Sequence, residues 1–189
     1  MPLGDMPMPI QPELTFGGTL EIILEGVWRA IYVNDEPPPE DVPAARGYAL
    51  VVKGEYGYVT ERDDSEGEGW TIVEGEIAAG ETSEEFVARA AHDQTGAAVS
   101  QTIYSGYLDC EATKFNTEYE AGAHTVRPVY VAVASEVGPV PDGSGYHRRR
   151  LPMNQFQNAV RLRYPELWKH FSRGLDRYLI LQRTGKIAG

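Results

Sequence analysis

The sequence predicts an α+β fold, in which helices pack on a mixed β-sheet. Segments with the β-branched and aromatic content of strands lie both before and after one central helical segment. The part of the chain that follows residue 152 has apolar residues at helical spacing. With 189 residues, of which 42% are apolar, the chain has the size and composition of one ordinary domain with a sizeable core.

The N-terminal part is predicted to form a tail, a strand pair and a linker. Residues 1–18 are rich in proline and methionine, which favours a poorly ordered tail. Residues 20–24 and 27–33 have strand composition and are separated by a break at Glu25-Gly26. Prolines between residues 37 and 43 favour a stiff, extended linker. The predicted divisions are a flexible tail (1–18), a strand pair with a proline-rich linker (19–44) and a main domain (45–189).

A strand pair of this kind cannot form a hydrophobic core alone. It must therefore pack either on the main domain or on a second copy of the chain. Because prolines separate the strand pair from the main domain and its strands need burial, we predict a homodimer.

The main domain is predicted to contain strands before and after a capped helix. Thr82 and Glu85 have the spacing of a capping box, and Gly96 is a typical helix end. The central helix is therefore predicted to cover Ser83–Thr95. In chain order, the other predicted elements are strands at 47–53, 56–60 and 70–73, an acidic loop at 61–69, strands at 106–110 and 127–134, long loops at 111–125 and 137–149, a helix at 153–163 and a last helix that starts at Pro165.

Composition excludes several classes of protein. The net charge is −11 and acidic residues are concentrated in the first half, which disfavours extensive contact with nucleic acid. No apolar run is long enough to cross a membrane. The single cysteine, Cys110, excludes an internal disulfide and a multi-cysteine zinc site. Together with a start that lacks the features of a signal peptide, these observations predict a cytoplasmic protein.

The segment between Gly75 and Gly96 carries the most chemical information. Gly75 is followed after five residues by Glu81, and seven more residues lead to Arg89. With Gly96 as the final glycine, this spacing resembles the Nudix box of hydrolases that act on a nucleoside diphosphate linked to another moiety. The resemblance covers roughly residues 46–180. It implies an α/β/α sandwich with a Nudix-like mixed sheet, a central box helix and C-terminal helices.

The resemblance also implies a metal site on the box helix. In the family, three glutamates hold Mg²⁺ or Mn²⁺, which neutralises charge on the pyrophosphate. Helix positions i, i+3 and i+4 lie on one face, so these glutamates form a compact cluster of oxygen atoms. In this chain the matching positions are Ala90, Asp93 and Gln94. One charged ligand thus stands where three are implied, and the metal affinity is expected to fall steeply.

By the same resemblance, Glu81, Arg89 and Asp93 stand at catalytic-motif positions, although Glu81 and Arg89 chiefly form a structural ion pair in the family. Glu74 stands where the family often has a glycine whose carbonyl helps to bind the metal. Glu74 and Asp93 are therefore the candidate metal ligands. If the protein is active, the expected cofactor is Mg²⁺ or Mn²⁺, and if it is not, no cofactor is needed.

Residues outside the motif offer further candidates. Arg148, Arg149 and Arg150 form the one basic cluster, which is interpreted either as a phosphate clamp or as solvated charge that pairs with the acidic half. A group of carboxylates near the loop 111–125 is interpreted as the source of a relocated catalytic base or, in the simpler interpretation, as solvated loop charge. Its members are Asp109, Glu111, Glu118 and Glu120.

Three functions follow from these observations. The first is a metal-dependent pyrophosphohydrolase whose activity is weak or lost because glutamates are replaced at Ala90 and Gln94. The second is a non-catalytic domain that binds a nucleotide derivative as a sensor or regulator. The third is a structural role, in which two copies exchange the N-terminal strand pair. In the first two, the expected partner is a small-molecule nucleotide derivative rather than a membrane or an extended nucleic acid.

Overall fold

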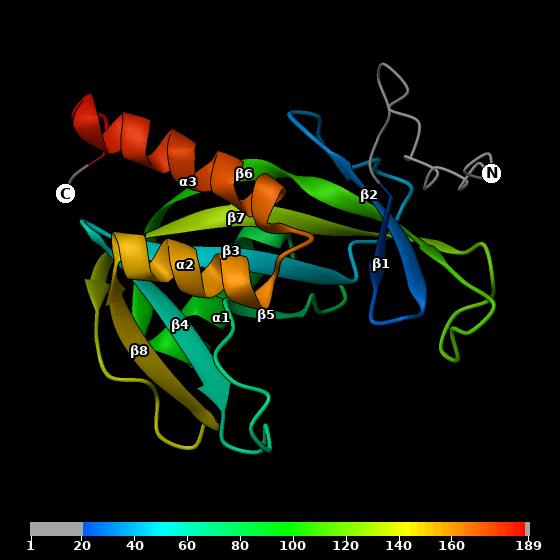
Figure 1. The fold of residues 1–189 in the computed structure, drawn as a ribbon, viewed down its shortest axis with the longest axis horizontal. Coiled ribbons are helices and arrows are strands. Elements are labelled where there is room, and N and C mark those ends of the chain that lie inside the picture. Colours follow the sequence, from blue (N-terminus) through cyan, green and yellow to red (C-terminus); the bar gives the residue numbers. More distant parts are fainter. Residues whose placement is uncertain (1–20, 188–189) are drawn as a thin grey trace, which may run out of the picture.

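The protein is represented by a computed structural model that describes residues 21–187 (Figure 1). The predicted α+β class is confirmed. The predicted flexible tail, residues 1–18, lies outside the described residues. The strands are β1 (Glu21–Leu24), β2 (Trp28–Val33), β3 (Arg46–Lys53), β4 (Tyr56–Arg62), β5 (Val73–Glu76), β6 (Ala97–Ala112), β7 (His124–Val137) and β8 (Tyr146–Pro152), and the helices are α1 (Ser83–Thr95), α2 (Met153–Arg163) and α3 (Trp168–Arg183).

The strands form one mixed sheet with the order β1-β2-β6-β7-β3-β4-β8, and β5 pairs with β3. The pair β3–β7 is parallel and the other ladders are antiparallel. Apolar side chains form two clusters. One cluster contains Phe86 and Val87 of α1, and the other contains buried side chains of α2 and α3 such as Phe156 and Phe171. The sheet therefore lies between helices, as an α/β/α sandwich requires.

The N-terminal strand pair joins the main sheet of its own chain. β2 pairs with β6 over the whole register from Trp28 opposite Ala112 to Val33 opposite Tyr107. Glu25 and Gly26 form the turn between β1 and β2 with positive φ values of 55° and 72°, which suits a tight hairpin. Alternate side chains, including Trp28, are buried in the core. Packing on the main domain thus buries this hairpin within one chain, and the homodimer stays a prediction.

The structure corrects the expectation of a long loop at 137–149. Residues Tyr146–Pro152 form β8, an edge strand that pairs with β4 from Tyr56 opposite Pro152 to Arg62 opposite Tyr146. The segment lacks the β-branched residues that indicate a strand, so the strand arises from pairing with β4 rather than from local preference. β6 and β7 also extend well beyond the predicted 106–110 and 127–134, and their ladder contains register shifts typical of β-bulges.

Candidate functional site

Helix α1 has the predicted bounds, and its ends are fixed by local chemistry. The Glu85 backbone N–H donates to the Thr82 hydroxyl at 3.2 Å, and the Thr82 N–H donates to the Glu85 carboxylate at 2.9 Å. Gly96 ends the helix in the left-handed conformation at φ 74°, and a Cβ at this position would stand 2.4 Å from the Gly138 carbonyl oxygen. These contacts fix where α1 begins and where it ends.

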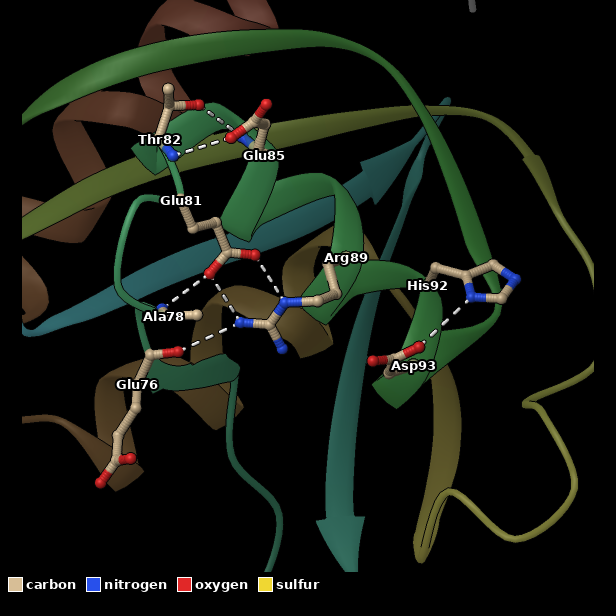
Figure 2. Close-up of polar contacts among 8 residues, drawn as sticks. All are labelled: Glu76, Ala78, Glu81, Thr82, Glu85, Arg89, His92 and Asp93. Carbon is tan, nitrogen blue, oxygen red and sulfur yellow. Dashed lines mark hydrogen bonds and ion pairs between the residues drawn. The ribbon is translucent and has the colours of Figure 1, made fainter.

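The ion pair between Glu81 and Arg89 connects the loop before α1 to the helix (Figure 2). The Arg89 guanidinium donates to both carboxylate oxygens of Glu81, at 2.6 and 2.9 Å, and also to the Glu76 carbonyl at 3.2 Å. The Glu81 carboxylate accepts a further hydrogen bond from the Ala78 N–H at 2.9 Å. These partners belong to the end of β5, the loop and the helix, so the pair holds the loop in place between the strand and α1.

The pair predicts a specific response of stability to pH. Hydrogen bonds from Arg89 lower the pKa of Glu81 to about 2, from an ordinary value of 4.5. The ionised carboxylate is therefore favoured in the folded state, and its contribution to stability is complete above about pH 4.5 and is lost as the pH falls towards 2. Urea unfolding between pH 6 and 2.5 is expected to show a smaller loss of stability in Glu81→Gln than in the unchanged protein. If the free energy of unfolding falls equally with pH in both proteins, the Glu81 carboxylate does not stabilise the folded state.

The three positions of the implied metal cluster do not form one. Ala90 is only 2% exposed and has no ligand atom, while Gln94 is buried at 6%. The Gln94 side-chain nitrogen donates a hydrogen bond of 2.8 Å to the carbonyl oxygen of Glu74. An amide donor therefore occupies the carbonyl that the resemblance assigns to metal binding. A cation requires oxygen acceptors at this point, so these residues do not fit the implied metal.

Asp93 lies apart from this contact. Its carboxylate is about half exposed and lies 3.4 Å from the ring of His92, to which it is joined in Figure 2. Asp93 lines a shallow groove beside Pro141, whereas Glu74 lines a larger cleft on the other side of Ala90. The structure thus does not bring the two candidate ligands into one site. Within residues 21–187, no group of three or more His, Cys, Asp or Glu side chains is arranged to hold a metal ion.

The larger cleft lies next to α1 and has a volume of about 1010 Å³. Sequence reasoning missed three of its four arginines, because they come from β3, β4 and α2. Its charged lining residues are Arg46, Arg62, Arg89, Arg163, Glu68, Glu74 and Glu76. Arg62 pairs with Asp64 and Arg89 pairs with Glu81.

Arg46 and Arg163 have a different environment from the other two arginines. Neither forms an ion pair with an acidic side chain within the part of the chain that the structure describes. Both act on Glu74, whose pKa is raised because the carboxyl is buried, while the two guanidinium groups oppose this increase. The cleft therefore contains two guanidinium groups that are available to an anionic ligand, since a guanidinium group matches the geometry of phosphate oxygens.

The predicted basic cluster lies outside this cleft. Arg148 donates to the carbonyl oxygens of Thr95, at 2.7 Å, and of Gly138, so it holds the end of α1. Arg150 stacks over the ring of Tyr56, and Arg149 is exposed on β8. Among the loop carboxylates, Asp109 and Glu111 lie next to His124. None of the four loop carboxylates lines the cleft; Glu118 instead lines a second, smaller pocket.

The fold is similar to those of several solved protein structures. The chain is similar to the pyrophosphohydrolase BsRppH of Bacillus subtilis, with 19% identity over 70% of this chain and 77% of that chain, and a TM-score of 0.56. It is also similar to the Nudix domain of NrtR from Shewanella oneidensis in complex with ADP-ribose, with 14% identity over 77% and 94% of the two chains, and a TM-score of 0.48. A Nudix hydrolase of M. smegmatis, RenU, matches with 16% identity over 73% and 90%, and a TM-score of 0.48.

The protein has the Nudix fold, as the likeness to BsRppH shows. No family model matches the sequence. No curated protein matches it either. Within residues 21–187, the structure contains no helix that is long and apolar enough to span a membrane.

Proposed function

We propose that the protein is a member of the Nudix family with a degenerate box, and that it binds a nucleoside diphosphate derivative without the box metal. The observation that carries this proposal is the hydrogen bond from the Gln94 amide to the Glu74 carbonyl, beside a buried Ala90. The neutral Gln94 amide donates a hydrogen bond to the Glu74 carbonyl oxygen, which a cation would otherwise bind. In this proposal Glu81 and Arg89 have a structural role, and Asp93 is not a metal ligand.

The charge of the cleft supports a phosphate-bearing ligand. Arg46 and Arg163 lie near Glu74 and form no ion pair of their own within residues 21–187. Two guanidinium groups on one cleft can bind adjacent phosphate groups through paired hydrogen bonds, which is the role that a metal ion has in other members of the family. A diphosphate suits this arrangement without any cation.

Ligand binding in the absence of metal tests the proposal. The full chain is incubated in EDTA with nucleoside diphosphates, nucleoside diphosphate sugars and dinucleoside polyphosphates, and its melting temperature is measured. At least one of these ligands is expected to raise the melting temperature, because a ligand that binds only the folded state stabilises it. Arg46→Gln is expected to abolish this increase, whereas Arg149→Gln, which changes an exposed arginine outside the cleft, is expected to preserve it.

A parallel assay separates binding from hydrolysis. Phosphate release from the same compounds is measured with Mg²⁺ or Mn²⁺, and little or no turnover is expected. Robust metal-dependent turnover would overturn the proposal and would favour a hydrolase in which Glu74 or another carboxylate replaces the missing ligands. A protein that neither binds nor hydrolyses any of these compounds would favour a structural role.

A further inference from the structure

A second pocket opens beside the larger cleft, between the N-terminal hairpin and the loop that joins β6 to β7. Its volume is about 380 Å³. Arg46, Glu76 and Ile77 line both this pocket and the cleft, so the two hollows are neighbours along one surface. A ligand whose phosphates lie at Arg46 therefore has space for its other end beside the hairpin. We call this space the hairpin pocket.

Two aromatic rings form a wall of the hairpin pocket. The centroids of the Trp28 and Tyr119 rings are 5.1 Å apart, and the ring planes are tilted by 60°. Trp28 is fixed in the sheet and is 6% exposed, whereas Tyr119 belongs to the loop and is 38% exposed. Flat rings bind to surfaces of this kind by stacking and edge contacts.

Hydrogen bonds hold the loop against the hairpin turn, so the aromatic wall is preformed. The side-chain oxygen of Asn116 accepts from the Tyr119 N–H at 2.9 Å, and its side-chain nitrogen donates to the Val27 carbonyl at 3.4 Å. The Thr113 hydroxyl donates to the same carbonyl at 3.1 Å. Tyr119 is thereby positioned next to Trp28 without a ligand.

The polar lining of the hairpin pocket is richer in acceptors than in free donors. Glu76 and Glu118 line it with carboxylates that form no ion pair within residues 21–187, while the Glu25 carboxylate is paired with Arg127. Of its two arginines, Arg127 is already bonded to both oxygens of Glu25 and to the Tyr48 hydroxyl, so only Arg46 is left as a cation for a ligand. Carboxylates accept hydrogen bonds and do not donate them when ionised. The pocket therefore suits a flat group that carries N–H donors.

We propose that the hairpin pocket binds the nucleobase of a nucleoside diphosphate held in the cleft, and that it prefers a base with an exocyclic amino group. This inference rests on the proposed binding function. The amino group donates a hydrogen bond to a carboxylate of the pocket, and the ring packs on Trp28 and Tyr119. A base with a carbonyl at the same position presents an acceptor to these carboxylates and keeps only the single ring N–H beside it as a donor, so fewer hydrogen bonds form and binding weakens.

Pairs of ligands related by deamination test the preference, since in each pair the amino group becomes a carbonyl and the neighbouring ring nitrogen gains a hydrogen. Dissociation constants are measured by calorimetry in EDTA for CDP against UDP, for ADP against IDP, and for inorganic pyrophosphate. We expect CDP and ADP to bind about tenfold more tightly than UDP and IDP, since a hydrogen bond to a charged group is worth about that factor. Equal affinities within both pairs, with pyrophosphate bound, would overturn this inference alone. No binding of any diphosphate would overturn the proposed function as well.

Matched variants of one loop locate the base. Tyr119→Ala removes an aromatic wall, and Glu118→Gln removes a charged acceptor; each is expected to weaken ADP binding several-fold and to leave pyrophosphate binding unchanged. The controls are Phe115→Ala, which removes a ring that is 65% exposed, and Glu120→Gln, and neither residue lines the pocket. If the control variants weaken ADP binding as much as Tyr119→Ala and Glu118→Gln do, the base does not bind in the hairpin pocket.

Discussion

The double variant Ala90→Glu with Gln94→Glu is expected to bind Mn²⁺, which the unchanged protein is not expected to do. With Asp93, the two new carboxylates lie at positions i, i+3 and i+4 of α1, on one face of the helix. Ala90 lines both the cleft and the neighbouring groove, so a longer side chain at this position has space to reach the cleft. Three carboxylates and the Glu74 carbonyl then supply the oxygen ligands that a divalent cation prefers.

Without metal, the double variant is expected to be less stable than the unchanged protein. Gln94→Glu removes the donor to the Glu74 carbonyl and brings a carboxylate towards that oxygen. A buried acceptor without its donor costs about 1–3 kcal/mol. Mn²⁺ at 100 times its dissociation constant should restore about 2.7 kcal/mol. Melting curves with and without Mn²⁺, together with calorimetric titration, measure both effects.

A neutral variant of the same size provides the control. Ala90→Gln with Gln94 unchanged adds side-chain volume but no charge, so Mn²⁺ should not raise its melting temperature. If the double glutamate variant shows no Mn²⁺-dependent increase either, the surrounding arginines exclude a cation, and the loss of metal binding extends beyond the box.

Glu25→Ala is expected to cause the largest loss of stability of any exposed side chain that we consider. The Arg127 side chain is 2% exposed and its guanidinium bonds to both oxygens of Glu25, at 2.8 and 3.2 Å. Removing one partner of a buried ion pair costs roughly 3–5 kcal/mol, because the other charge remains buried without a partner. The Glu25 side chain is 56% exposed, which lets water approach, so we expect about 2–3 kcal/mol.

The ion pair between Glu21 and Arg29 in the same hairpin provides the control. Both of its side chains are about half exposed, so Glu21→Ala should cost less than about 1 kcal/mol. Hydrogen bonds from Arg127 lower the pKa of Glu25, so this carboxylate stabilises the protein above about pH 4.5 and less as the pH falls. The difference between the unchanged protein and Glu25→Ala in urea should therefore shrink between pH 6 and 3. Equal stability of the two proteins at pH 7 would contradict a stabilising role for this pair.

Prediction from the sequence was most accurate where the determining contacts are local. The bounds of α1 follow from Thr82, Glu85 and Gly96, which interact with the helix within a few residues. β8 was missed because its residues have no strand preference and become a strand only by pairing with β4. The expected arginine cluster was misleading for a similar reason, since Arg148 bonds to the Thr95 carbonyl at the end of α1, which lies far from it in the sequence.

The sequence by itself determined the fold class, the central helix and the side chains that this helix presents at Ala90, Asp93 and Gln94. Each of these depends on residue identity and on spacing within one element. Only the tertiary structure decided that Gln94 bonds to the Glu74 carbonyl, and that arginines from β3, β4 and α2 line one cleft. It also decided that the hairpin joins its own sheet. These contacts link segments that are distant in the sequence, and packing of the whole chain brings them together, so no local pattern encodes them.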